Sequence, residues 1–183
     1  MSETGFNRMQ TLKRRMFAMR NGVVADALRQ AGCPRRIIFG LNLPQLTEIA
    51  SEFGPDAQLA LELFRDVNVR ESQLLAPMLM PREAVTDEAA AKLAEGVAWA
   101  EEADILCNKL LRWLPGAPDL ATRLCASENR LKRYTGLRLM AAMTCVNQDE
   151  RLRKEAVSAA LAELRRPEPI AALAAQIIAD NDY

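Results

Sequence analysis

The residues best suited to chemistry lie in two neighbouring predicted helices. The first carries the polar segment Glu101-Glu102-Ala103-Asp104, and the second contains Lys132, Arg133 and Arg138 on a surface that is apolar on almost every side. An earlier apolar helix opens on the pair Arg70-Glu71. A charged group beside a buried face costs free energy unless it is paired or used. We therefore expect the functional site in these helices.

The sequence contains no histidine, which limits the kinds of catalytic group that the protein can use. The commonest general base and every Ser-His or Cys-His pair are excluded, so Asp, Glu, Lys, Tyr or water would carry any reaction. The four cysteines have no C-x-x-C spacing, and zinc would need thiolates or carboxylates alone. We expect buried thiols in a reducing compartment, no metal and no other cofactor. The cysteines are Cys33, Cys107, Cys125 and Cys145.

Length and composition predict one soluble domain spanning residues 1–183. Of its residues, 50% are hydrophobic and 26% are charged, as in ordinary globular proteins. No apolar run approaches the roughly 20 residues that cross a bilayer. No apolar segment follows the basic residues near the N-terminus, so we expect no signal peptide, no membrane partner and a cytoplasmic protein.

The net charge is zero, but the charges are unevenly distributed. Residues 1–40, a basic helical region, contain eight Lys and Arg against two acids. Residues 41–127 contain seven against 14, and residues 128–166 contain nine against five. The two basic regions are suited to binding phosphates, whereas the neutral total argues against strong nonspecific binding of nucleic acid.

Helical spacing occurs almost throughout, and no segment alternates as a strand would. About ten helices joined by short turns, with a rhythm of roughly 35–40 residues per helix pair, favour an all-α solenoid of antiparallel helix pairs over a four-helix bundle. The expected helices are Phe6 to Ala31 (interrupted at Asn21-Gly22), Pro44 to Phe53, Asp56 to Asp66, Arg70 to Met80, Thr86 to Gly96, Trp99 to Trp113, Asp119 to Cys125, Ser127 to Cys145, Glu150 to Leu164 and Pro167 to Ile178.

Four segments within about residues 20–145 are similar, in order and spacing, to one known family. They contain a Gly-x-x-x-Pro entry to a helix, an Arg-Glu helix, a Trp segment that ends in an aspartate, and an arginine near the start of a later inner helix. On these segments the chain resembles the DNA alkylation-repair glycosylases built from HEAT-like helical repeats, the AlkD-like family. The segments are Ile38-Phe39-Gly40-Leu41-Asn42-Leu43-Pro44, Arg70-Glu71 with the apolar run to Leu79, Trp99-Ala100-Glu101-Glu102-Ala103-Asp104, and Asn129-Arg130-Leu131-Lys132-Arg133.

The resemblance implies a HEAT-like α-α superhelix that binds duplex DNA and excises purines alkylated at N3 or N7. Carried over by position, Asp104 would stabilise the sugar cation and position water, and Arg133 would hold a phosphate. A fixed anion stabilises an oxocarbenium-like state, and alkylation already makes the purine a good leaving group, so a site without histidine suffices. The further DNA-contacting residues would be Lys132, Arg138, Trp99, Tyr134, Arg35 and Arg36.

Other roles for these residues stay open. Arg133 and Arg138 are suited to an ion pair with Asp104 or Glu101, to phosphate, or to each in a different state. Asp104 falls at the edge of the apolar stripe of its helix, where a solvated aspartate is ordinary. Trp99 and Trp113 fall on that stripe, which favours packing in the core for both.

A non-catalytic HEAT-like module that binds DNA structures or a protein partner is the alternative function. The family motif has an aromatic residue four positions before the aspartate, where this chain has Ala100. Trp99 lies one residue earlier, about 100° around the helix. This departure and the acidic middle of the chain favour the alternative.

Overall fold

The computed structural model describes residues 3–181 and is helical, as the sequence predicted. These residues form eleven α-helices and two short 3-10 helices, with one isolated bridge between Ile37 and Val69 in place of any strand. None of their helices is long and apolar enough to cross a membrane. The chain folds as two compact units, Met1–Val85 and Thr86–Tyr183. The single domain expected from the sequence stays a prediction.

The helices agree with the expected rhythm, and most begin within about two residues of the position that the sequence indicated. The first unit contains α1 (Glu3–Ala18), α2 (Gly22–Gln30), α3 (Leu43–Phe53), α4 (Ala57–Arg65), α5 (Arg70–Leu79) and η1 (Arg82–Ala84). The second contains α6 (Asp87–Glu95), α7 (Ala100–Lys109), η2 (Leu111–Trp113), α8 (Ala117–Cys125), α9 (Arg130–Thr144), α10 (Glu150–Leu164) and α11 (Ala171–Asn181).

Side-chain caps fix several of these boundaries. The Asn42 carboxamide accepts from the Gln45 backbone N–H in a capping box at the start of α3. Asn129, rather than the expected Ser127, caps α9 by accepting from two backbone N–H groups. The helix expected from Trp99 to Trp113 ends early, because the backbone leaves the helical conformation at Leu110.

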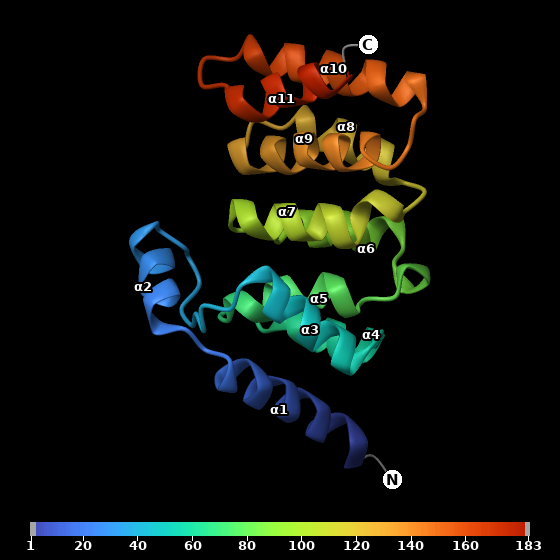
Figure 1. The fold of residues 1–183 in the computed structure, drawn as a ribbon. Helices are drawn as coiled ribbons and strands as arrows, with labels where there is room; N and C mark the ends of the chain where they lie inside the picture. Colours follow the sequence, from blue (N-terminus) through green and yellow to red (C-terminus); the bar gives the residue numbers. More distant parts are fainter. Residues whose placement is uncertain (1–2, 182–183) are drawn as a thin grey trace. The chain divides into compact units, whose positions relative to one another are not determined.

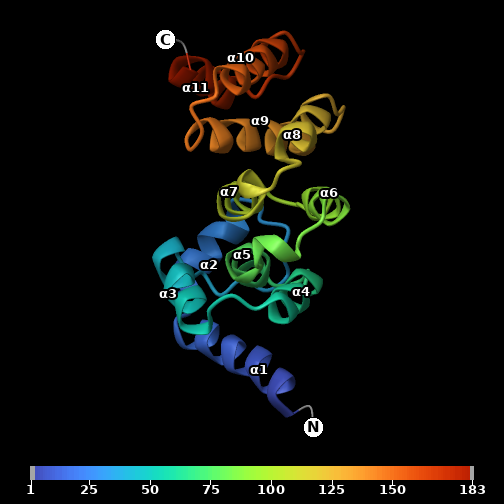
Figure 2. The ribbon, with the colours of Figure 1, turned by 90° about the vertical axis from the view of Figure 1, so that its right-hand side faces the viewer.

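In the first unit, α5 lies between α3 and α4 (Figure 2). Its charged opening pair, Arg70 and Glu71, is buried. The Glu71 carboxylate accepts from the backbone N–H of Phe39 at 3.0 Å and of Gly40 at 2.9 Å, and from Arg70 Nη1 at 2.7 Å. The pair therefore anchors the connection between α2 and α3. Its function is structural, which corrects the expectation that these charges belong to a functional site.

Gly40 lets that connection pass close to α2. Its φ is +80°, and a Cβ atom there would lie 2.2 Å from the backbone oxygen of Asn21. Only glycine fits both the left-handed backbone and this approach. The glycine of the Gly-x-x-x-Pro segment is thus explained by packing within the first unit.

The second unit is a stack of helical layers, with α6 and α7 in one layer, α8 and α9 in the next, and α10 and α11 in the last (Figures 1 and 2). The helix α9 contacts α7, α8 and α10. Gly136 permits its close crossing with α8, since a Cβ atom there would lie 2.7 Å from the Cys125 backbone nitrogen. This arrangement places one face of α9 against α7, where the predicted site residues lie.

Candidate functional site

A three-residue cluster joins α7 to α9. Asp104 Oδ1 accepts a hydrogen bond from the Tyr134 hydroxyl at 2.8 Å and from Arg138 Nε at 2.7 Å. Tyr134 and Arg138 are four residues apart on α9, and this spacing puts both side chains on the same face of a helix. The structure therefore brings together three of the residues singled out in the sequence.

The two oxygens of the Asp104 carboxylate have different surroundings. Both hydrogen bonds end on Oδ1, and no residue of the described part of the chain donates to Oδ2. The Asp104 and Arg138 side chains are 31% and 28% exposed, so the pair lies at the surface of the unit, within reach of a ligand. A carboxylate fixed in this way presents its second oxygen without further reorganisation.

Burial of the neighbouring groups shapes the electrostatics of the cluster. Partial burial, together with the hydrogen bond to Asp104, raises the pKa of the Tyr134 phenol from 10.0 to about 12. Tyr134 is therefore a neutral donor at physiological pH. Burial, and then the negative charge of Asp104, also raises the pKa of the Cys107 thiol, which keeps this cysteine protonated and unreactive.

Arg133 does not lie at Asp104. Its Nε donates to Glu163 Oε2 at 2.9 Å, its Nη1 donates to the Glu128 backbone oxygen at 2.9 Å, and the residue is only 6% exposed. Glu163 also accepts from the Ile170 backbone N–H at 3.1 Å, so the pair joins α9, α10 and the turn before α11. This buried, paired guanidinium does not favour the phosphate contact expected for Arg133. Arg138 occupies the place beside the carboxylate instead.

The remaining candidates of the second unit lie near this cluster in sequence but make other contacts. Lys132 Nζ lies 3.8 Å from Glu95 Oε1, and its side chain is 38% exposed. Trp99 is half-buried and precedes α7, where its backbone oxygen accepts from the Ala103 N–H. Trp113 is 39% exposed, which contradicts its expected place in the core.

Arg35 and Arg36 belong to the first unit. Arg35 Nη1 donates to the Val67 backbone oxygen at 2.7 Å, which holds the segment before α3 against the α4–α5 connection. Arg36 is exposed. Of Arg35 and Arg36, the exposed Arg36 is therefore the more accessible to a ligand.

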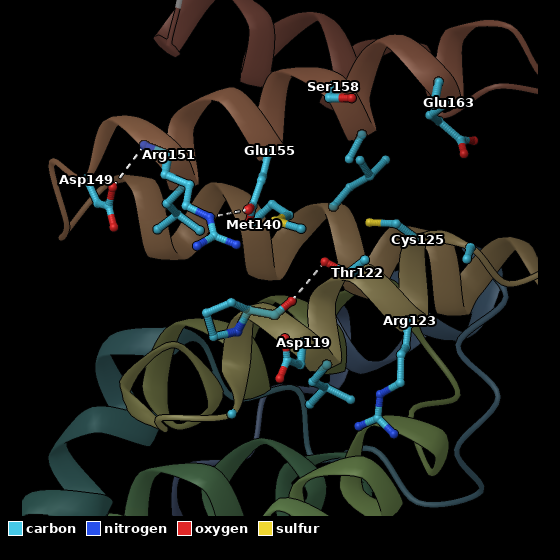
Figure 3. Close-up of a pocket in the computed structure, with 18 of the residues that line it drawn as sticks. Asp119, Thr122, Arg123, Cys125, Met140, Asp149, Arg151, Glu155, Ser158 and Glu163 are labelled. Carbon is cyan, nitrogen blue, oxygen red and sulfur yellow. Dashed lines mark hydrogen bonds and ion pairs between the residues drawn. The ribbon is translucent and has the colours of Figure 1, made fainter.

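A cavity of about 1260 Å³ lies between α8 and α10 (Figure 3), and no sequence pattern predicted it. Thr122, Arg123 and Cys125 line it from α8, and Glu155 and Ser158 line it from α10. Its residues come from several helices with unremarkable spacing, so no local sequence signal could have identified it. Asp104 is not among its lining residues.

Comparison with known proteins agrees with the helical fold. The helical layers define a HEAT-like repeat protein. A solved structure from a family of proteins related to the HEAT-like repeat DNA glycosylases with affinity for branched DNA structures is similar over 93% of this chain and 74% of that chain, with a TM-score of 0.79 and 16% sequence identity.

Residues 12–168 match the profile of the DNA alkylation repair enzyme family, and the chain belongs to that family. A search of the curated proteins finds no match.

Proposed function

We propose that the second unit binds DNA and excises N3- or N7-alkylated purines, with Asp104 as the carboxylate beside the reacting sugar. Membership of the DNA alkylation repair family supports the substrate class. The observation that carries the proposal is the geometry of Asp104, whose Oδ1 is held by Tyr134 and Arg138 while Oδ2 receives no hydrogen bond within the described residues. This oxygen can face a developing positive charge.

Excision of an alkylated purine requires few catalytic groups from the protein. The bond between the sugar C1′ and the purine nitrogen breaks, and its electron pair leaves with the positively charged alkylated base, which becomes neutral. Asp104 stabilises the resulting oxocarbenium-like sugar, water adds at C1′, and the proton of that water passes to the carboxylate or to solvent. No general acid is needed for the leaving base, in keeping with a protein that has no histidine.

Arg138 has two roles in this proposal. Without DNA it offsets the charge of Asp104 through their 2.7 Å contact. With DNA bound, its guanidinium holds a backbone phosphate, and the Asp104 charge is then available to the sugar. Tyr134, neutral at physiological pH, keeps the carboxylate oriented throughout.

Release of 7-methylguanine and 3-methyladenine from alkylated duplex DNA tests the proposal. Under single-turnover conditions we expect Asp104→Asn to slow release by at least about tenfold, equivalent to about 1.4 kcal/mol in the barrier. Asp119→Asn is the matched control, because Asp119 is an exposed acid of the same unit on α8. Absence of release by the wild-type protein, or equal release by the Asp104 variant, would contradict the excision proposal.

A second candidate function is binding of branched DNA without excision. The similar solved structure is described by its affinity for branched DNA structures, and this chain has Ala100 where the resemblance expects an aromatic residue. Competition between a four-way junction and a linear duplex of equal length distinguishes the two functions. Preference for the junction with no base release favours the second function, whereas base release favours the first.

A further inference from the structure

A half-buried arginine without an acidic partner lies on the α7 side of the Asp104 cluster. Arg112 belongs to η2, and its guanidinium carbon lies 4.6 Å from the centre of the Trp113 ring. Its Nη1 makes one long hydrogen bond, at 3.4 Å, to Asn108 Oδ1. Its Nε is buried and has no hydrogen-bond partner within the described residues. This guanidinium therefore retains donors that the second unit does not use.

The pairing of Arg112 differs from that of the two arginines on α9. Arg133 is paired with Glu163, and Arg138 is paired with Asp104. No carboxylate of the described residues forms an ion pair with Arg112. A partly desolvated charge without a counterion is costly, and an external anion would supply the missing partner.

A short chain of hydrogen bonds connects Arg112 to the candidate site. Asn108 Nδ2 donates to the Asp104 backbone oxygen at 2.9 Å, and Asn108 Oδ1 accepts from Arg112. Both contacts end on the one Asn108 side chain, so Arg112 lies close to the Asp104 segment although η2 follows the break in the helix at Leu110.

We propose that Arg112 binds a backbone phosphate of the DNA that occupies the Asp104 site. The choice of DNA as the ligand rests on the proposed function. Trp113 is the positioning residue, because its ring covers one face of the guanidinium and fixes the plane of the fork. A fixed planar fork suits the paired oxygens of a phosphate. Arg112 and Arg138 then hold the DNA backbone at two points, one of them directly beside the carboxylate.

Salt-dependent binding of an unmodified linear duplex of about 20 base pairs tests this role. We expect Arg112→Ala to weaken binding about fivefold to tenfold near 100 mM salt and to reduce the slope of log affinity against log salt by about 0.9, the value for one lost phosphate contact. Arg112→Lys should restore most of the slope but only part of the affinity, because lysine keeps the charge and loses the fork.

Arg153→Ala is the matched control. Arg153 lies on α10, is likewise half-buried, and its Nε likewise has no hydrogen-bond partner within the described residues. We expect this variant to bind DNA within about twofold of wild type. Trp113→Leu should weaken binding while the salt slope is retained, because the charge remains and only its orientation is lost. Thermal unfolding checks that each variant is folded, and Arg112→Gln replaces Arg112→Ala if the latter unfolds.

Identical affinities and slopes for the Arg112 and Arg153 variants would overturn the role of Arg112. If Arg138→Ala still weakens binding in that case, the proposed function stands without this contact. If Arg112→Ala weakens binding and Asp104 and Arg138 variants have no effect on binding or base release, the phosphate contact stands and the proposed site is wrong. Absence of any DNA binding by wild type contradicts both proposals.

Discussion

Arg138 Nε donates to Asp104 Oδ1 at 2.7 Å, so the arginine on α9 that meets the α7 carboxylate is Arg138 and not Arg133. The carboxylate is held by an arginine and a tyrosine, and its second oxygen accepts no hydrogen bond from the described residues. A cation that a phosphate can bind thus lies directly beside an anion that a positively charged sugar can approach.

The ion pair between Arg133 and Glu163 is expected to stabilise the fold and to contribute nothing to DNA binding. Both residues are buried, at 6% and 3% exposure. Removing Arg133 leaves the buried Glu163 carboxylate with only the longer ion pair to Arg166 Nε, at 3.7 Å, so Arg133→Met should lower the free energy of unfolding by about 3 kcal/mol. Chemical denaturation measures this change. The salt slope of DNA binding should stay that of wild type, and a reduced slope in a folded Arg133 variant would restore its phosphate role.

Gly40→Ala is expected to destabilise the first unit more than Gly54→Ala. Both glycines have positive φ, so alanine costs about 1–2 kcal/mol of backbone strain at either position. At Gly54 no atom lies within 4 Å of the added Cβ, whereas at Gly40 the Asn21 oxygen would lie at 2.2 Å. Comparison of the two unfolding curves isolates the contact with α2. Equal destabilisation would mean that the connection relaxes freely.

The Tyr134 phenol is expected to titrate near pH 12 in the folded protein, above its ordinary value of 10.0. Burial is the first cause of the raised pKa, and the hydrogen bond and charge of Asp104 follow. Asp104→Asn should therefore lower the pKa towards 10, while Arg138→Ala should raise it further, since the Arg138 charge lowers it. Ultraviolet titration, with Tyr134→Phe subtracted, measures these shifts. Shifts of the same sign would contradict the contacts of the cluster.

The same raised pKa links Tyr134 to stability. The folded state holds the phenolic proton more tightly than the unfolded state, so the stabilisation from this group is complete below about pH 10 and is lost as the pH rises towards 12. Unfolding midpoints across this range should fall less steeply for Tyr134→Phe than for wild type. A parallel decline in both proteins would assign the alkaline loss of stability to other groups.

The helices followed from the sequence because their signals are local. Apolar spacing, Pro44 at a helix start, Thr86 as a cap and Gly96 as a stop placed helices near their observed ends. The family resemblance singled out Asp104, and the polar residues of the otherwise apolar helix singled out Tyr134 and Arg138; the structure brings the three together. Their contacts agree with one of the alternatives left open, an ion pair between Asp104 and an arginine of α9.

Which arginine of α9 meets Asp104 could not be predicted. Arg133 and Arg138 are five residues apart, which at about 100° per residue separates them by roughly 140° around the helix. A helix that is apolar on nearly every side has no polar face to fix its rotation. The packing of α9 against both α7 and α10 decides that Arg138 faces Asp104 and Arg133 faces Glu163.

The exposure of Trp113 was predicted wrongly for a related reason. Its place on the apolar stripe assumed an unbroken helix from Trp99. The helix ends at Lys109, and Leu110 has φ −124° and ψ −65°, so the regular rotation per residue does not continue to Trp113. No glycine or proline marks the break, so the sequence pattern did not indicate it.

The central claim is that Asp104 and Arg138 form a DNA site. It is tested most directly by removing each charge in turn, which should change DNA affinity in opposite directions. Equilibrium binding of a linear duplex is measured for wild type, Asp104→Asn and Arg138→Ala at several salt concentrations. We expect Asp104→Asn to bind more tightly than wild type, because Arg138 is released for phosphate. Arg138→Ala should bind about tenfold more weakly, with a salt slope reduced by about 0.9. Wild-type affinity and slope in both variants would contradict a DNA site at this pair.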